Sequence, residues 1–294
     1  MKKLLTTFFL ASLFSVGYAQ QDPQFSMYFN NQLFFNPAAA GAEYNTQIVG
    51  QFRNQWVGFD GAPTTASLTG DHYFKKIRSS FGVIGMYDEI GFQKTGKALL
   101  AYAYRIPIKK TFLQIGVDFG TITQEMEGNF IPIQPGDPSI PTGSSTDTKF
   151  IFSGGLYFWS KRFSAGFSAR NLNGPKLELN NLSGEPLSVA RHYYLYLQYR
   201  QPLGENFTFR PTFLVKSDAA STQLDASLLF YYLDWCYLGA SYRIDDAVVL
   251  TTGGKAGIIW LQYAYDITTS KLSGYSSGSH EFMIRYTIPY KKED

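Results

Sequence analysis

The sequence predicts an all-β protein, a transmembrane antiparallel β-barrel of about fourteen strands, and three observations lead to this fold class. Apolar and polar residues alternate with a period of two through most of the chain after Thr46. Aromatic residues make up 17% of the composition and charged residues only 17%, a mixture that favours strands. The connections between the alternating segments are short on one side and include the long ones on the other.

The alternation is clearest in residues 113–121, 163–170 and 207–216. In the first of these, Leu, Ile, Val and Phe occupy every second position, and Gln, Gly and Asp lie between them. Because successive side chains of a strand point to opposite faces, one face is apolar and the other is small or charged. Lipid outside and a polar lumen inside require this arrangement.

Segments of this kind number about fourteen, and each is close to the roughly 9–11 residues that a tilted membrane strand needs. Their predicted spans are 46–56, 64–74, 79–88, 96–106, 112–123, 149–160, 162–171, 190–201, 206–217, 222–233, 235–244, 247–254, 256–266 and 279–289. If both ends of the barrel lie in the periplasm, the even-numbered connections are the short periplasmic turns. The long connections, 124–148, 172–189 and 267–278, are then all surface loops.

The two ends of the chain are predicted to contribute no strand to the barrel wall. Residues 1–19 resemble a cleavable signal peptide, with Lys2 and Lys3 before an apolar stretch and Ala19 at the expected cleavage site. The barrel then spans 46–290, and 291–294 form a periplasmic tail. Residues 20–45 do not alternate; they either plug or cap the periplasmic end of the barrel, or form a leader that packs on its lower rim.

A soluble β-sandwich is the competing fold. Its exposed faces would be rich in Lys, Glu and Thr, whereas the polar faces here hold mainly Gly, Ser, Thr, Gln and single charges. Aromatic residues near strand ends also suit the girdles of a membrane barrel. The predicted girdle residues are Tyr87, Trp159, Tyr199, Tyr231, Trp235, Tyr265 and Tyr286.

Composition and motifs argue against several functions. A net charge of +3, with the basic residues scattered singly, gives no reason to expect nucleic-acid binding. His72, His192 and His280 lie on separate predicted strands without metal-ligand spacing, and no GxSxG motif occurs. We therefore predict no enzyme, no metal and no cofactor.

Charged residues on the predicted inner face form the first candidate site. They either pair with one another and stiffen the interior, or line a lumen that selects or holds a ligand. By strand parity they are Arg53, Asp71, Lys97, Arg105, Asp118, Arg170, Arg200, Arg210, Lys216, Asp225, Arg243, Glu281 and Arg285.

The first surface loop is the second candidate site. Trp56, Phe59 and Pro63 would lie at the outer mouth, where exposed aromatic residues commonly anchor protein partners. A membrane girdle is the alternative role for Trp56.

Five stretches together resemble the PorP/SprF family of type IX secretion system outer-membrane proteins. They are QDPQFSMYFNN after the signal, FNPAAAG at 35–41, WVGFDGAPTT at 56–65, YDITTSKLS at 265–273 and SGSHEF at 277–282. The resemblance implies an integral outer-membrane location and a role in protein binding without turnover, in support of secretion, surface attachment or gliding motility. The implied partners are outer-membrane lipids, a secreted cargo protein with a C-terminal sorting domain, and subunits of the secretion machine.

The last two stretches flank the final long outer loop. Tyr265, Asp266, Ser279, His280 and Glu281 match them and either bind cargo or pin that loop. An outer-membrane channel or transporter for small or hydrophobic solutes is the alternative function, because about fourteen strands enclose a lumen that is either open or plugged.

Overall fold

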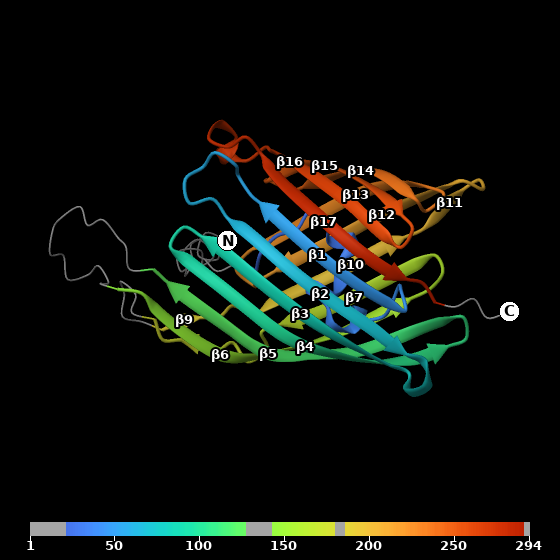
Figure 1. The fold of residues 1–294 in the computed structure, drawn as a ribbon, viewed down its shortest axis with the longest axis horizontal. Helices are drawn as coiled ribbons and strands as arrows, with labels where there is room; N and C mark the ends of the chain where they lie inside the picture. Colours follow the sequence, from blue (N-terminus) through green and yellow to red (C-terminus); the bar gives the residue numbers. More distant parts are fainter. Residues whose placement is uncertain (1–21, 128–142, 180–185, 291–294) are drawn as a thin grey trace, which may run out of the picture.

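A closed antiparallel sheet forms the wall of the protein (Figure 1). The computed structural model describes residues 22–127, 143–179 and 186–290. Within these ranges the first wall strand, β1 (Thr46–Asn54), pairs with the last, β17 (Ser279–Ile288), which closes the ring. The predicted all-β fold, a 14-stranded antiparallel barrel, is confirmed.

The strands follow one another around the ring in chain order. The other wall strands are β2 (Thr64–Phe74), β3 (Ser79–Ile90), β4 (Gln93–Ile108), β5 (Thr111–Met126), β6 (Ser145–Trp159), β7 (Phe163–Arg170), β10 (His192–Tyr199), β11 (Gln201–Leu203), β12 (Phe207–Ser217), β13 (Thr222–Tyr232), β14 (Cys236–Arg243), β15 (Ala247–Ala256) and β16 (Ile259–Thr268). β11 continues β10 after a break at Arg200, and both pair with β12, so the two occupy one position in the ring. Each predicted span overlaps one such position.

The two ends of the barrel differ, as the alternating connections predict. One end, which we call the short-turn end, carries the turns 75–78, 109–110, 160–162, 204–206, 233–235 and 257–258. The opposite, long-loop end carries the connections 55–63 and 269–278 and a short hairpin of β8 (Lys176–Leu177) with β9 (Leu187–Ser188). That hairpin lies within a connection predicted as a plain loop.

Apolar side chains cover the outside of the wall. Val117 and Phe167 are each 47% exposed on the outside of the wall, and Ile115 and Phe119, two residues to either side of Val117, are exposed to a similar degree. Gln114 and Asp118, on the opposite parity of β5, are completely buried. The outside of the wall is therefore the side that faces lipid.

The girdle prediction is wrong for two residues. Tyr231 is only 2% exposed and stacks on Tyr237 inside the barrel, with ring centroids 4.9 Å apart. Trp159 likewise stacks on Phe112 at 5.2 Å, and its indole nitrogen is buried. Both side chains lie at inward-facing positions of their strands. The lumen near the short-turn end is therefore filled with aromatic rings as well as polar groups.

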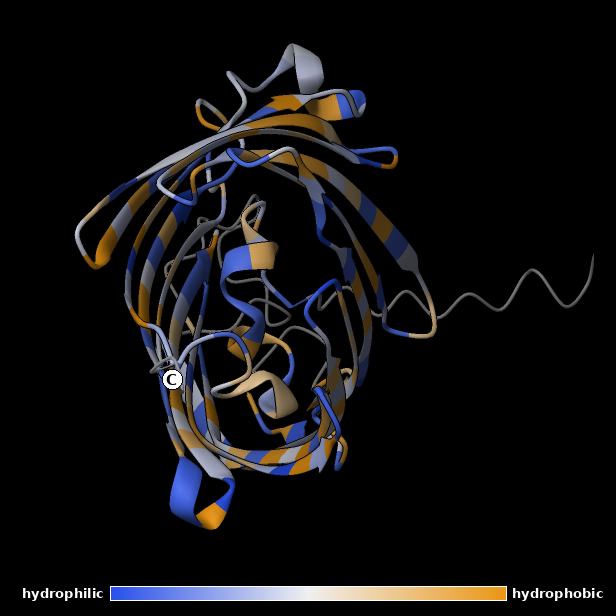
Figure 2. Ribbon diagram, turned by 90° about the vertical axis from the view of Figure 1, so that its right-hand side faces the viewer, coloured by the Kyte–Doolittle hydropathy of each residue, from blue (hydrophilic) through white to orange (hydrophobic). Residues whose placement is uncertain are grey.

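Residues 22–45 lie inside the ring, as the end-on view shows (Figure 2). The segment contains three single 3-10 turns, η1 (Tyr28–Asn30), η2 (Gln32–Phe34) and η3 (Pro37–Ala39). Two further 3-10 turns, η4 (Lys75–Ile77) and η5 (Lys271–Gly274), lie in connections between strands. Among the described residues, no helix has the length and apolar character needed to cross a bilayer.

The segment passes through the barrel from one end to the other. Asp22 forms an ion pair with Lys97, near the long-loop end of β4. Nineteen residues later along the chain, the Gly41 N–H donates to Asp71 near the short-turn end of β2, at 2.7 Å. The chain then enters β1 at Thr46. The predicted signal peptide, 1–19, and the predicted tail, 291–294, lie outside the described residues.

Candidate functional site at the long-loop mouth

Two connections far apart in the sequence pair at the long-loop end. The Val57 N–H donates to the Gly278 carbonyl at 2.8 Å, and the Ser277 N–H donates to the Val57 carbonyl at 2.7 Å. The Trp56 N–H donates to the Ser279 hydroxyl at 3.1 Å. The WVGFDGAPTT and SGSHEF stretches are thereby joined into one surface, which we call the outer face (residues 55–63 and 269–278).

Gly278 is required where the two connections meet. Its φ of +91° lies in the region that favours glycine. A Cβ at this position would also come within 2.6 Å of the Asp266 carbonyl oxygen and 2.9 Å of the Tyr265 ring. Backbone conformation and the available space therefore both require glycine at this position. With glycine here, the connection 269–278 can lie against the connection 55–63.

The outer face presents two aromatic rings to solvent. Phe59 is 45% exposed and Tyr275 is 73% exposed, whereas Trp56 is half-buried and Pro63 is buried. Of the three predicted anchors in this loop, only Phe59 is thus displayed. Tyr275 was missed because it lies outside the period-two pattern; an aromatic residue within a Gly/Ser-rich loop was the available signal.

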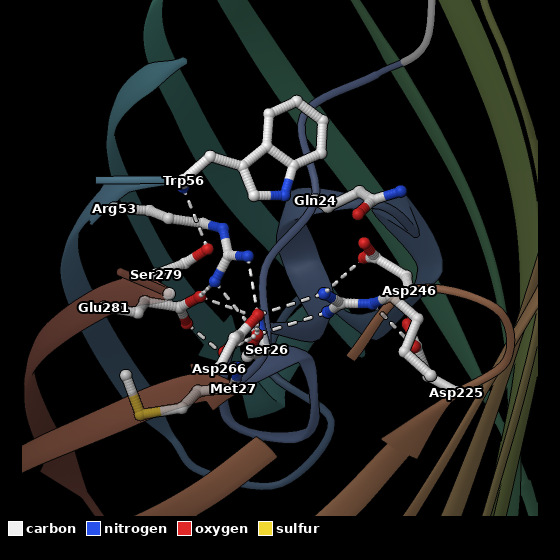
Figure 3. Close-up of polar contacts among 12 residues, drawn as sticks. Gln24, Ser26, Met27, Arg53, Trp56, Asp225, Asp246, Asp266, Ser279 and Glu281 are labelled. Atoms are coloured by element: carbon white, nitrogen blue, oxygen red, sulfur yellow. Dashed lines mark hydrogen bonds and ion pairs between the residues drawn. The ribbon is translucent and has the colours of Figure 1, made fainter. Parts of the chain in front are cut away.

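A buried ionic network lies beneath the outer face (Figure 3). Arg53 of β1 forms ion pairs with Asp266 of β16 at 2.7 Å and with Glu281 of β17 at 3.1 Å. None of the three side chains is more than 1% exposed. Strand pairing positions these three side chains. Arg53 lies directly opposite Glu281 in the β1–β17 register. Glu281 lies opposite Ala264 in the β16–β17 register, and Asp266 is two residues further along β16, on the same face.

Arg243 of β14 extends the network around the wall. Its guanidinium contacts Asp225 at 2.8 Å, Asp266 at 3.1 Å and Asp246 at 3.3 Å. Asp266 is therefore shared by two arginines. Such a pairing compensates the charges of the buried carboxylates and guanidiniums.

The N-terminal segment is part of the same network. The Ser26 and Met27 N–H groups donate to the two carboxylate oxygens of Glu281, at 2.7 and 2.9 Å. The Ser26 hydroxyl donates to Asp266 at 2.8 Å and accepts from Arg53 at 3.0 Å and from Arg243 at 3.2 Å. Buried backbone donors need partners. Here the wall supplies them, which binds the segment to the barrel.

Aromatic packing fixes the middle of the segment. Phe35 stacks on Tyr194 of β10 at 5.7 Å, and Phe29 meets the Tyr237 ring edge-on at 6.0 Å. Gln32 donates to the Tyr196 hydroxyl at 2.7 Å. The inner wall is thus partly aromatic, a feature that the polar-lumen prediction omitted.

The FNPAAAG turn packs directly against the backbone of the inner wall. A Cβ on Gly116 of β5 would lie 2.5 Å from the Ala38 Cα, so the turn reaches the backbone of the wall. Asn36 accepts from the Ala38 N–H at 2.9 Å and donates to the Leu156 carbonyl at 3.0 Å. Asn36 therefore both caps η3 and ties it to β6.

Most predicted lumen charges bind this segment or pair with one another. Arg170 donates to the Phe34 carbonyl and lies 3.9 Å from Asp118. Lys216 donates to the Asp22 carbonyl. Arg105 donates to the Gly41 carbonyl, and Arg200 pairs with Glu43. Near the short-turn end, Arg210 pairs with Asp234, and Arg285 is stacked over the rings of Tyr44, in the segment, and Trp260, in the wall.

The residues matched to the closing motifs divide into two groups. Asp266, Ser279 and Glu281 are buried, and their partners belong to the chain itself. Tyr265 and His280 are half-buried on the other face of the wall. Tyr265 donates to the Ser277 carbonyl at 2.9 Å, while His280 Nδ1 lies 2.7 Å from the Tyr263 hydroxyl. No cluster of potential metal ligands occurs in the described part of the chain.

The closed wall, its apolar exterior and its polar, occupied interior define an outer-membrane β-barrel. A family model described as "Type IX secretion system membrane protein PorP/SprF" matches residues 17–286. The chain therefore belongs to the PorP/SprF family, as the five stretches indicated. It is a membrane barrel of a secretion-system family and not of an enzyme family.

The comparison with solved structures finds membrane barrels at low sequence identity, and the first of the following three shares the fold. The toluene transporter TbuX of Ralstonia pickettii is 11% identical, with a TM-score of 0.52 and coverage of 87% of this chain and 92% of that one. Omp33 of Acinetobacter baumannii is 10% identical, with a TM-score of 0.49 and coverage of 84% and 100%. A Pseudomonas aeruginosa FadL homologue is 10% identical, with a TM-score of 0.49 and coverage of 88% of this chain and 94% of that one. No functionally curated protein matches the chain.

Proposed function

We propose that this barrel is an accessory component of the type IX secretion system that holds a protein partner at the outer face. The partner is a secreted cargo with a C-terminal sorting domain or a subunit of the machine, and the result is export, surface attachment or gliding motility. The pairing of residues 55–63 with 269–278 carries the proposal. It joins two stretches typical of the family and exposes Phe59 and Tyr275 together.

In this proposal the N-terminal segment is a plug. Its aromatic residues and backbone groups are bound from Asp22 to Glu43 by inward side chains of the wall. A filled lumen supports a holding function rather than solute passage. The signal peptide, residues 1–19, would deliver the chain to the outer membrane.

Binding at the outer face is tested by removing the two exposed rings. We expect the Phe59→Ser, Tyr275→Ser double variant to lose capture of a secreted cargo by pull-down from outer-membrane extracts, because exposed aromatic anchors supply much of the energy of an interface. Trp235→Ser is the matched control, since Trp235 is 51% exposed at the opposite end. Equal capture by the double variant and the wild type would reject the outer face as the binding surface.

A channel or transporter for small or hydrophobic solutes is the second candidate. The similarity in fold to the toluene transporter TbuX favours it. Planar-bilayer conductance separates the two functions: a plugged accessory barrel should pass almost no current, whereas a channel passes a steady, solute-dependent one.

A further inference from the structure

A donor-rich cavity opens inside the short-turn mouth, at the opposite end from the outer face. Its volume is about 270 Å³. It is lined by Glu43, Tyr44, Trp159, Arg200, Arg210, Tyr231, Asp234, Lys255 and Trp260. We propose that this cavity binds a carboxylate-bearing peptide segment of a protein in the compartment that the short turns face.

The cavity holds more positive than negative charge. Arg200 is neutralised by Glu43. Arg210, whose side chain is 17% exposed, pairs with Asp234 at 2.5 Å, but the Asp234 side chain is 71% exposed, so solvent weakens this pair. Lys255 forms no side-chain hydrogen bond or ion pair with any described residue. At least one cation is therefore available to a ligand.

Buried donors without partners add to this surplus. Trp260 is 3% exposed, and among the described residues its indole N–H has no acceptor. Arg285 is 2% exposed and lies over the Trp260 and Tyr44 rings at 5.2 and 5.4 Å, with no carboxylate paired to it in the described chain. A buried guanidinium without a counter-ion is costly, and an anion in the adjacent cavity would offset that cost.

The position and the lining of the cavity favour a peptide over a lipid headgroup. Trp159, Tyr231 and Trp260 have inward parity, so the cavity opens to the lumen mouth and not to the lipid face. Their rings provide apolar walls on which the methylene groups of an Asp or Glu side chain can pack. Arg210, stacked 3.8 Å above the Tyr231 ring, is pre-oriented as a donor to a carboxylate.

The rim around this mouth would attract an acidic partner. Three consecutive turns carry basic residues, while the other turns at this end hold Glu205 and Asp234. The basic residues are Lys75, Lys76, Arg78, Lys109, Lys110, Lys161 and Arg162, and all are exposed. Clustered charge of one sign raises the association rate of an oppositely charged partner. Short turns of outer-membrane barrels are periplasmic, which places this mouth in the periplasm.

Binding is measured with the full-length protein in detergent micelles, by calorimetry and by tryptophan fluorescence. The probe is the peptide Gly-Ser-Gly-Ser-Asp-Glu with a free carboxyl end, and its amidated Asn-Gln counterpart is the neutral comparison. We expect the acidic peptide to bind and the neutral one to fail. Lys255→Gln and Arg210→Gln should each weaken binding about tenfold, the loss that follows from removing one charge-assisted hydrogen bond.

Lys176→Gln is the matched control, because Lys176 is exposed at the long-loop end, away from the cavity and its basic rim, and its loss should leave the affinity nearly unchanged. Equal binding of the neutral peptide, or an equal loss in the control, would overturn the proposal. Inorganic phosphate that displaces the peptide at equal concentration would also overturn it, because the cavity would then be a general anion site. The outcome does not depend on whether a partner binds the outer face.

Discussion

At the scale of single residues, strand parity decides which side chains face the lumen, and strand register decides which of them meet. Arg53 and Glu281 are separated by 228 positions in the chain, yet they are direct partners across the β1–β17 pair. The sequence indicated that both point inward. It did not indicate that Glu281 also accepts two backbone N–H groups, because the path of the N-terminal segment is not encoded in any periodic pattern.

Among the residues of the buried network, we expect the loss of Glu281 to reduce the stability of the barrel most. We expect Glu281→Ala to lower the free energy of unfolding by about 3–5 kcal/mol, because it leaves the buried Arg53 with one partner fewer and exposes two N–H groups without acceptors. Urea unfolding in lipid vesicles, followed by tryptophan fluorescence, measures the change.

Two variants control this experiment. Phe282→Leu alters the next residue, which is 54% exposed on the lipid side, and should change the midpoint little. Glu281→Gln keeps the shape and one acceptor oxygen and should lie between the other two. A midpoint for Glu281→Ala that equals the wild type would show that the network contributes nothing to stability.

At the scale of elements, the fit between η3 and the wall depends on small residues in the strands. Gly116 has inward parity, and the sequence predicted only that it faces the lumen. Only the tertiary structure shows why this residue is glycine: Ala38 approaches so closely that a side chain would not fit.

Gly116→Val should push the FNPAAAG turn away from β5, since the new side chain would overlap the Ala38 backbone. The strand itself should persist, because valine is well suited to a β-sheet. We expect a loosened plug, seen as higher single-channel conductance and faster proteolysis of the segment. Gly50→Val is the matched control, because a Cβ at Gly50 meets no atom within 4 Å. Wild-type conductance in both variants would refute the plug.

At the scale of the whole molecule, the apolar exterior makes the bilayer part of the folding free energy. Val117 and Phe167 lie on the lipid-facing side of β5 and β7. Replacing either with Arg should destabilise the barrel by about 2–4 kcal/mol near the membrane midplane. Val117→Leu, which stays apolar, is the comparison. Refolding titrations in urea that give the same midpoint for Val117→Arg and Val117→Leu would contradict the assigned facing.

Charge is distributed unevenly over the molecule, and this too becomes visible only at this scale. The basic residues of the turns 75–78, 109–110 and 160–162 are well separated in the sequence, and no Lys/Arg-rich run predicted a basic surface. Antiparallel strands of similar length return each of these turns to the same end, where they are neighbours around half of the rim.

The sequence by itself determined the class of fold, the number and order of the wall strands, and the face of most side chains. Two-residue periodicity records these directly, because lipid on one side and enclosed polar groups on the other act on every strand locally. Tertiary structure decided how the interior is filled, which outer loops meet, and where the unpartnered donors gather. Those features depend on contacts between residues up to 255 positions apart, such as Ser26 with Glu281, and no local pattern can specify them.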